Sequence, residues 1–97
     1  MCDFQNLPPS TPSTLTASAS GKTVSLTWTD SSTDETGFKV LRKDSLTGNY
    51  STITTTSADA TTYSDTVTAA GNFWYRVSAT NSNGDSVASK MVKVDVE

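Results

Sequence analysis

Hydrophobic and polar residues alternate along most of the chain with the period of two that is typical of β-strands. The clearest stretch runs from Val24 to Trp28, where apolar residues occupy every second position and Ser or Thr lies between them. Phe38 and Val40 repeat this alternation, and so do the residues from Phe73 to Ala79. Apolar residues do not recur at helical spacing, so the chain is predicted to be all-β.

Turn-forming residues separate these stretches at Gly21, Gly48 and Gly71, and Asn83-Gly84 is the strongest hairpin signal because it allows the positive φ of a tight turn. Seven short strands are predicted at intervals of roughly 8–12 residues, which is typical of a β-sandwich. Their centres are, in order, Leu15, Leu26, Val40, Ile53, Tyr63, Tyr75 and Val94. Val87 is out of step with the last strand, so we expect a bulge near Lys90.

A series of short motifs runs through most of the chain. In order they are Leu15-Thr-Ala17, Val24-Ser-Leu26-Thr-Trp28-Thr-Asp30, Glu35-Thr-Gly37-Phe38-Lys-Val40, Tyr63-Ser-Asp65-Thr66, Tyr75-Arg76-Val77-Ser78-Ala79-Thr-Asn81 and Gly84-Asp85-Ser86. Together they resemble a fibronectin type III domain of the bacterial kind, from Ser13 to Val96. The resemblance implies an immunoglobulin-like, seven-stranded antiparallel β-sandwich.

The same resemblance implies a core built around Trp28 between the two sheets. Phe38, Val40, Tyr75 and Val77 would pack around it. The family often carries a Tyr at the start of the sixth strand, whose hydroxyl bonds back to the chain upstream. Phe73 stands at that position here, so this hydrogen bond is expected to be missing.

The length of 97 residues fits one domain, which we place at residues 14–97, preceded by a flexible arm at residues 1–13 that is rich in Pro, Ser and Thr. Phe4 and Leu7 are apolar residues through which the arm could dock on another subunit; the alternative is that the arm is a solvated linker. Cys2 is either the remnant of a lipoprotein processing site or an ordinary cysteine of the arm.

Composition excludes several classes of function. The chain has no His and one Cys, which argues against the usual zinc site, a Ser-His-Asp or Cys-His nucleophile and a disulfide framework. The net charge of −3 argues against nucleic acid as a partner. No apolar run approaches the ~20 residues of a membrane span. We therefore expect no enzyme activity and no cofactor.

Three carboxylates, Asp30, Asp34 and Glu35, lie within six residues of the loop between the second and third strands. They could bind Ca²⁺ through oxygen ligands, but their spacing is not that of an EF-hand. The alternative is that they hydrogen-bond the backbone of their own loop. We predict no metal site.

The candidate binding surface is one outer sheet face. If Phe73 and Tyr75 point into the core, then Trp74 and Arg76 point outward. The same alternation places Lys39, Leu41 and Lys43 outside on the neighbouring strand. An exposed Trp beside basic residues could stack on a sugar or anchor a protein. Alternatively, the stem of Arg76 or Lys39 covers the indole.

These expectations favour a non-catalytic spacer or binding module with a protein or glycan partner. The family resemblance implies a place in a secreted or surface multidomain protein, such as a polysaccharide-degrading enzyme, and hence an extracellular or cell-surface location. The alternative is a small structural or decoration protein of a phage virion that docks through its N-terminal arm.

Overall fold

The computed structural model describes residues 9–31, 35–45 and 47–96 of the chain. These residues form eight strands and no helix that could span a membrane. The strands are β1 (Ser13–Ser20), β2 (Thr23–Thr29), β3 (Gly37–Lys43), β4 (Ser51–Ser57), β5 (Thr62–Thr66), β6 (Gly71–Asn81), β7 (Gly84–Asp85) and β8 (Val92–Val96). Phe4, Leu7, Cys2 and Asp34 lie outside the described residues.

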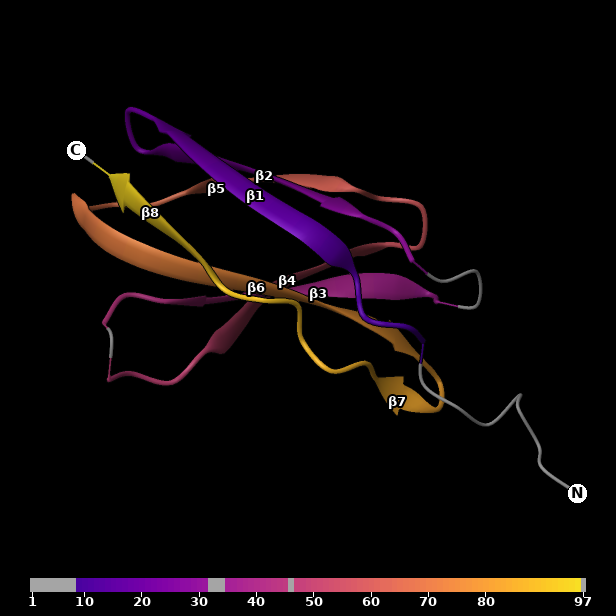
Figure 1. The fold of residues 1–97 in the computed structure, drawn as a ribbon. Coiled ribbons are helices and arrows are strands. Elements are labelled where there is room, and N and C mark those ends of the chain that lie inside the picture. The colour runs from indigo at the N-terminus through magenta and orange to yellow at the C-terminus, as the bar shows by residue number, and fades with distance from the viewer. Residues whose placement is uncertain (1–8, 32–34, 46, 97) are drawn as a thin grey trace, which may run out of the picture.

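Two antiparallel sheets face one another, as Figure 1 shows. The smaller sheet has the order β1-β2-β5. The larger sheet has the order β4-β3-β6, and both β7 and β8 pair with β6. The prediction of an all-β antiparallel sandwich is therefore confirmed. β1 and β8 are neighbours across the seam between the sheets, so the first and last strands close the same side of the molecule.

The core lies between the sheets and contains the residues that alternation placed there. Trp28, Phe38, Val40, Tyr75 and Val77 are all buried in one cluster. The rings of Trp28 and Phe38 have centroids 5.6 Å apart and are inclined by 58°, so they pack one strand of each sheet against the other. Burying these side chains supplies most of the free energy that stabilises so small a domain.

The last predicted strand is divided into β7 and β8, which is why the structure has eight strands where seven were expected. Residues 86–91 between them form no strand. Ser86 and Ser89 nevertheless tie this segment to β6, because their hydroxyls accept hydrogen bonds from the backbone N–H groups of Ala79 and Val77. These serine hydroxyls thus take the place of the backbone carbonyls that would accept hydrogen bonds from β6 in a regular strand pair. They do so just before Lys90, where the alternation of apolar and polar residues shifts by one position.

The predicted hairpin between β6 and β7 is present. Asn81 pairs with Gly84, and the side chain of Asn81 accepts a hydrogen bond from the backbone of Asn83. Gly84 carries the positive φ, at 129°, so the glycine of the Asn-Gly pair sits just after the turn.

We predict that Gly37→Ala lowers the free energy of unfolding by about 1–2 kcal/mol. Gly37 is buried at the start of β3, and a methyl group there would collide with the backbone oxygen of Thr56 on β4. Backbone cannot move aside cheaply, so β3 and β4 would separate at that end. Urea unfolding measures the loss, and Gly48→Ala, at an exposed turn with more room, is the matched control. Equal stability of the Gly37 variant and wild type would contradict this packing.

Candidate functional site

The outer face of the larger sheet gathers basic side chains. The chain has seven Lys and Arg residues in total. Strand register places four of them on this face, around Trp74 and Leu41; they are Lys39, Lys43, Arg76 and Lys93. Lys43 and Lys93 lie opposite Trp74 on its two neighbouring strands, and Leu41 lies opposite Arg76. We call this surface the basic face. It concentrates positive charge on a chain whose net charge is −3.

Trp74 points outward as expected, and the structure shows the covered indole rather than the exposed one, which were the two alternatives. Its relative exposure is only 9%, although it does not belong to the core cluster. Lys43 covers it, with the ammonium 5.8 Å from the ring centroid. The covering side chain comes from the opposite position on β3, whereas Arg76 or Lys39 was expected to do this. A sugar ring cannot stack on Trp74 in this arrangement, so the surface offered to a partner consists mainly of cationic groups.

Tyr50 joins the basic face from the residue just before β4. The ammonium of Lys43 lies 4.8 Å from the centroid of its ring, and the guanidinium carbon of Arg76 lies 5.0 Å from it. Cation–π contacts of this kind hold a positive group in place without neutralising its charge. Sequence reasoning missed Tyr50, because a single aromatic residue before a Thr-rich strand does not indicate which face it covers.

The corner formed by Tyr50 and Arg76 has polar groups that the described part of the chain does not satisfy. The Tyr50 hydroxyl and Arg76 Nε are buried without a hydrogen-bond partner there. Arg76 also forms no ion pair with any described residue. A hollow of about 150 Å³ lies between the end of β3 and the start of β4, but neither Tyr50 nor Arg76 lines it. Buried polar atoms are normally paired, so these two atoms set this corner apart from the rest of the face.

The ends of the basic face are partly neutralised. Lys39 Nζ lies 2.9 Å from Asp85 Oδ2, and the Thr80 hydroxyl donates to the same carboxylate at 2.6 Å. Thr80 and Lys39 together hold the pKa of Asp85 below its usual range. Lys93 is 3.9 Å from Asp95, and both side chains are exposed. Among the described residues, Arg76 at the centre of the face is thus the guanidinium without a carboxylate partner.

A second polar cluster lies inside the sandwich. The Asp65 carboxylate, buried on β5, accepts hydrogen bonds of 2.7 Å from Arg42 and from the Tyr75 hydroxyl. The cluster joins the two sheets, because Arg42 and Tyr75 belong to the larger one. It supplies a tyrosine hydroxyl bond two residues after Phe73, which stands where the family often carries the bonding Tyr. Burial and the bond to Asp65 raise the pKa of Tyr75.

Asp30, Asp34 and Glu35 are the carboxylates of the loop between β2 and β3 that were considered as calcium ligands. Asp34 lies outside the described residues, while Asp30 and Glu35 each make an interaction within the domain. Residues 9–31, 35–45 and 47–96 contain no group of three His, Cys, Asp or Glu side chains close enough to hold a metal ion. The described residues of the loop between β2 and β3 thus contribute no such group to the basic face.

Comparison of the sequence with protein-family models and with curated proteins finds no match. Solved structures do match. An Fn3-like protein from Clostridium thermocellum is 29% identical, with a TM-score of 0.75 over 92% of this chain and 94% of that one. The FN1–FN3 domains of chicken CNTN1 are 20% identical, with a TM-score of 0.74 over 92% of this chain and 34% of theirs.

A third match is the pectate lyase PelI from Erwinia chrysanthemi in complex with tetragalacturonic acid. It is 22% identical, with a TM-score of 0.68 over 82% of this chain and 26% of that protein. These likenesses establish that the chain has a fibronectin type III-like fold. The class of protein is thus a small β-sandwich domain of the kind that occurs both alone and as one part of longer chains.

Proposed function

We propose that this domain is a non-catalytic binding module that holds an acidic polysaccharide against its basic face, within a secreted or surface multidomain protein. The observation that carries the proposal is the cluster of Lys43, Arg76 and Tyr50 at the centre of that face. Among the residues that the structure describes, Arg76 contacts the Tyr50 ring and forms no ion pair, so no carboxylate of these residues competes for its guanidinium.

The chemistry of the cluster favours carboxylates as the groups bound. A guanidinium donates two parallel hydrogen bonds to a carboxylate, and such charge-assisted bonds are stronger than neutral ones. A uronic acid polymer presents carboxylates at regular intervals along an extended chain. The basic face is the flat outer side of a sheet, and it suits such a chain better than it suits a small molecule, which needs a pocket.

The comparisons support the context of the proposal. A domain with this fold forms part of a pectate lyase that was solved with tetragalacturonic acid. Oligogalacturonate is therefore the natural first probe. The proposal for this chain stands on its own charges, because a likeness at 22% identity concerns the fold.

We predict that the domain binds oligogalacturonate and that Arg76→Gln weakens this binding roughly fivefold or more, since a charge-assisted bond is lost. Affinity should also fall as salt is raised, because exposed charges are screened. Isothermal titration calorimetry measures both effects. Lys22→Gln is the matched control, since it removes one charge from the exposed turn between β1 and β2, and it should change affinity less than about twofold.

The carbohydrate control is a neutral glucan oligosaccharide of the same length, which should not bind. Equal binding of the neutral and acidic sugars would overturn the electrostatic basis of the proposal. If Arg76→Gln and Lys22→Gln lowered the affinity for oligogalacturonate equally, binding would depend on the net charge of the chain and not on the position of Arg76. If neither sugar binds at millimolar concentration, the module is not a glycan binder of this class and acts as a spacer or as a protein-docking part.

A further inference from the structure

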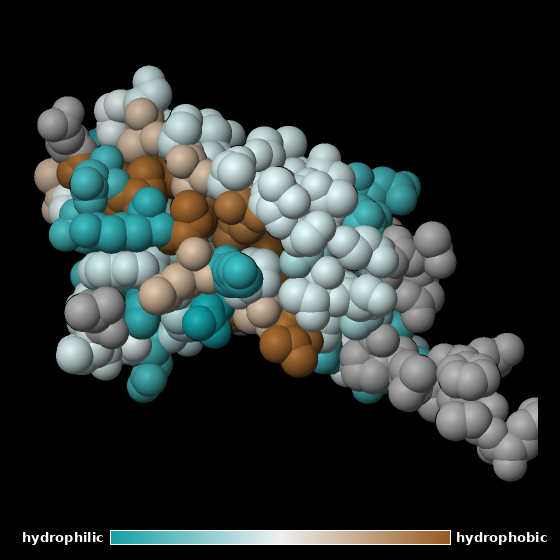
Figure 2. All heavy atoms as spheres, in the orientation of Figure 1, coloured by the Kyte–Doolittle hydropathy of each residue, from teal (hydrophilic) through white to brown (hydrophobic). Residues whose placement is uncertain are grey.

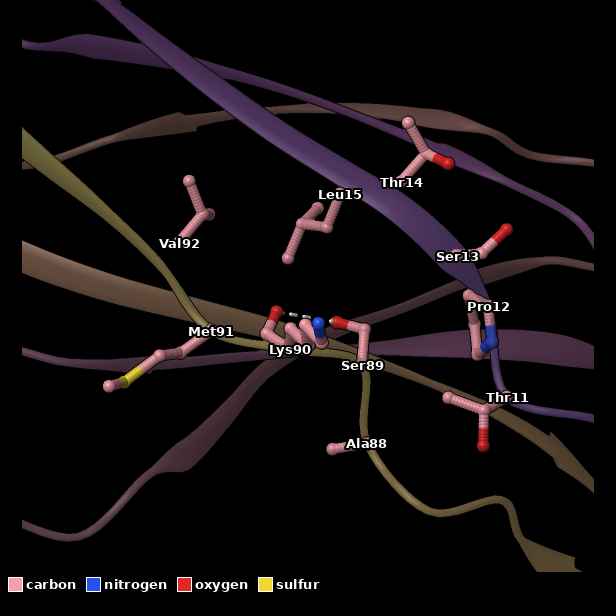
Figure 3. A pocket seen from close by; sticks show the side chains of 10 residues that line it. All are labelled: Thr11, Pro12, Ser13, Thr14, Leu15, Ala88, Ser89, Lys90, Met91 and Val92. Atoms are coloured by element: carbon pink, nitrogen blue, oxygen red, sulfur yellow. Dashed lines mark hydrogen bonds between the residues drawn. The ribbon is translucent and has the colours of Figure 1, made fainter.

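A groove separates β1 from the segment that leads into β8. Its volume is about 570 Å³, and it is lined by residues 11–15 on one side and residues 88–92 on the other. Figure 3 shows Leu15 and Val92 pointing into the space between the two strands. Both side chains also pack against the core. The groove thus has an apolar floor that is continuous with the interior of the sandwich.

The backbone on both walls is irregular. In β1 the register shifts between Ser13 and Thr16, so Thr14 and Leu15 pair with no residue of β2, and Thr14 has a φ of 56°. On the opposite wall, residues 86–91 belong to no strand. Ser86 and Ser89 of this wall donate backbone hydrogen bonds to β6, so the backbone without a ladder partner lies on the β1 wall, at Thr14 and Leu15, where an extended segment of chain can add hydrogen bonds.

Apolar side chains are exposed beside the groove. Figure 2 shows them along the seam between the sheets, on the side that β1 and β8 form. Met91, which lines the groove, is 49% exposed, and Val87 just upstream is 80% exposed. Exposed apolar surface next to a preformed apolar groove is typical of a docking site rather than of a solvated edge.

We propose that the groove receives the N-terminal arm of a second copy of this chain, with Phe4 and Leu7 as the side chains that enter it. Residues 1–8 of the arm lie outside the described structure, which begins at Pro9, two residues before the first residue that lines the groove. Lys90 is the charged side chain among the lining residues, and Asp3, next to Phe4, is the charged side chain of the arm. Arm and groove thus match in both apolar character and charge.

The arm of the same chain fits the groove poorly. Residues 11–15 form one wall, so the arm would have to reverse its direction almost at once in order to lie beside them. Pro9 restricts the residue before it to extended backbone, which disfavours such a reversal. Pro9 is itself buried against the domain. Eight extended residues span at most roughly 26–29 Å, so the arm can project well beyond Pro9 toward a second copy.

The association should be weak, because only two large apolar side chains and a short stretch of backbone are buried. A dissociation constant of roughly 0.1–1 mM is expected, which is in the range of small transient contacts. Exchange of two arms between two copies would raise the apparent affinity, because the second contact forms within the pair.

The chain supplies its own labels for the test. Cys2 is the single cysteine and lies in the arm, while Met1 and Met91 are the two methionines. One sample of the full chain carries a nitroxide on Cys2 and no isotope. A second sample carries Cys2→Ser and ¹³C-methyl methionine, with ¹⁵N throughout. When the two are mixed at high concentration, we expect the nitroxide to broaden the signals of Met91, Leu15 and Val92.

The control is a nitroxide-bearing chain with Phe4→Ser and Leu7→Ser, which should lose the broadening while its thermal unfolding is unchanged. Three outcomes would overturn the proposal. One is broadening only when nitroxide and isotope are on the same chain, which would assign the groove to its own arm. The others are no broadening at millimolar concentration and equal broadening by the doubly substituted arm.

Discussion

Replacing Trp28 with alanine is expected to lower the free energy of unfolding by about 3–5 kcal/mol, which is a large part of the stability of a small domain. Trp28 is 4% exposed and lies between the sheets against the ring of Phe38. Its removal would leave a cavity that strands from two different sheets cannot close without losing their register. The loss therefore includes both the burial of the indole and the contacts of its neighbours.

Chemical denaturation followed by far-ultraviolet circular dichroism measures this effect. Val87→Ala is the matched control, because that apolar side chain is 80% exposed and its truncation should change stability by less than about 0.5 kcal/mol. An alanine variant of Trp28 with an unchanged unfolding midpoint would show that the core is not organised around this residue.

The second large effect is expected at the buried ion pair that joins the sheets. Asp65→Asn should lower the free energy of unfolding by about 2 kcal/mol, because Arg42 and the Tyr75 hydroxyl lose a charged acceptor that lies 2.7 Å from each. Arg42 remains 31% exposed, so water compensates part of the loss and keeps it below that of a fully buried pair.

Asp59→Asn, on the exposed turn between β4 and β5, is the matched control for Asp65→Asn and should be nearly neutral. A double-mutant cycle with Tyr75→Phe tests whether the contact itself is responsible. If the two substitutions are additive, then Asp65 and Tyr75 do not stabilise one another and the cluster is not a unit.

The same cluster makes stability depend on high pH. Burial and the bond to Asp65 raise the folded-state pKa of Tyr75, so the folded protein holds this proton more tightly than the unfolded chain does. The contribution to stability is therefore complete below the unfolded value of about 10 and is lost as the pH rises above it. Tyr75→Phe should make the unfolding free energy less dependent on pH in that range.

The strands and the core could be predicted from the sequence because both follow from the same repeat, in which an apolar residue occupies every second position. Val24, Leu26 and Trp28 recur at every second position, and all three are buried. The same alternation contained a signal for the buried ion pair. Arg42 continues the inward positions of Phe38 and Val40, and an inward-facing Arg requires a carboxylate partner. Sequence reasoning passed over this residue, and the partner, Asp65, lies on the other sheet.

The exposure of Trp74 could not be predicted in the same way. Alternation gives the side of the sheet to which a residue points, but not what its neighbours do above it. Lys43 covers the indole because strand register places the two residues opposite one another on β3 and β6. Tyr50, which lies just before β4, then holds Arg76 and Lys43 in place through cation–π contacts. Such contacts depend on pairing between strands that are about 30 residues apart.

The most direct test of the proposed function uses the two tryptophans of the chain, Trp28 in the core and Trp74 on the basic face. A ¹⁵N–¹H titration with oligogalacturonate reports both indole signals at once. The account predicts that the Trp74 indole moves together with the amides of Arg76 and Lys43, while the Trp28 indole stays in place. Movement of neither indole, or equal movement of both, would contradict binding of an acidic glycan at this face.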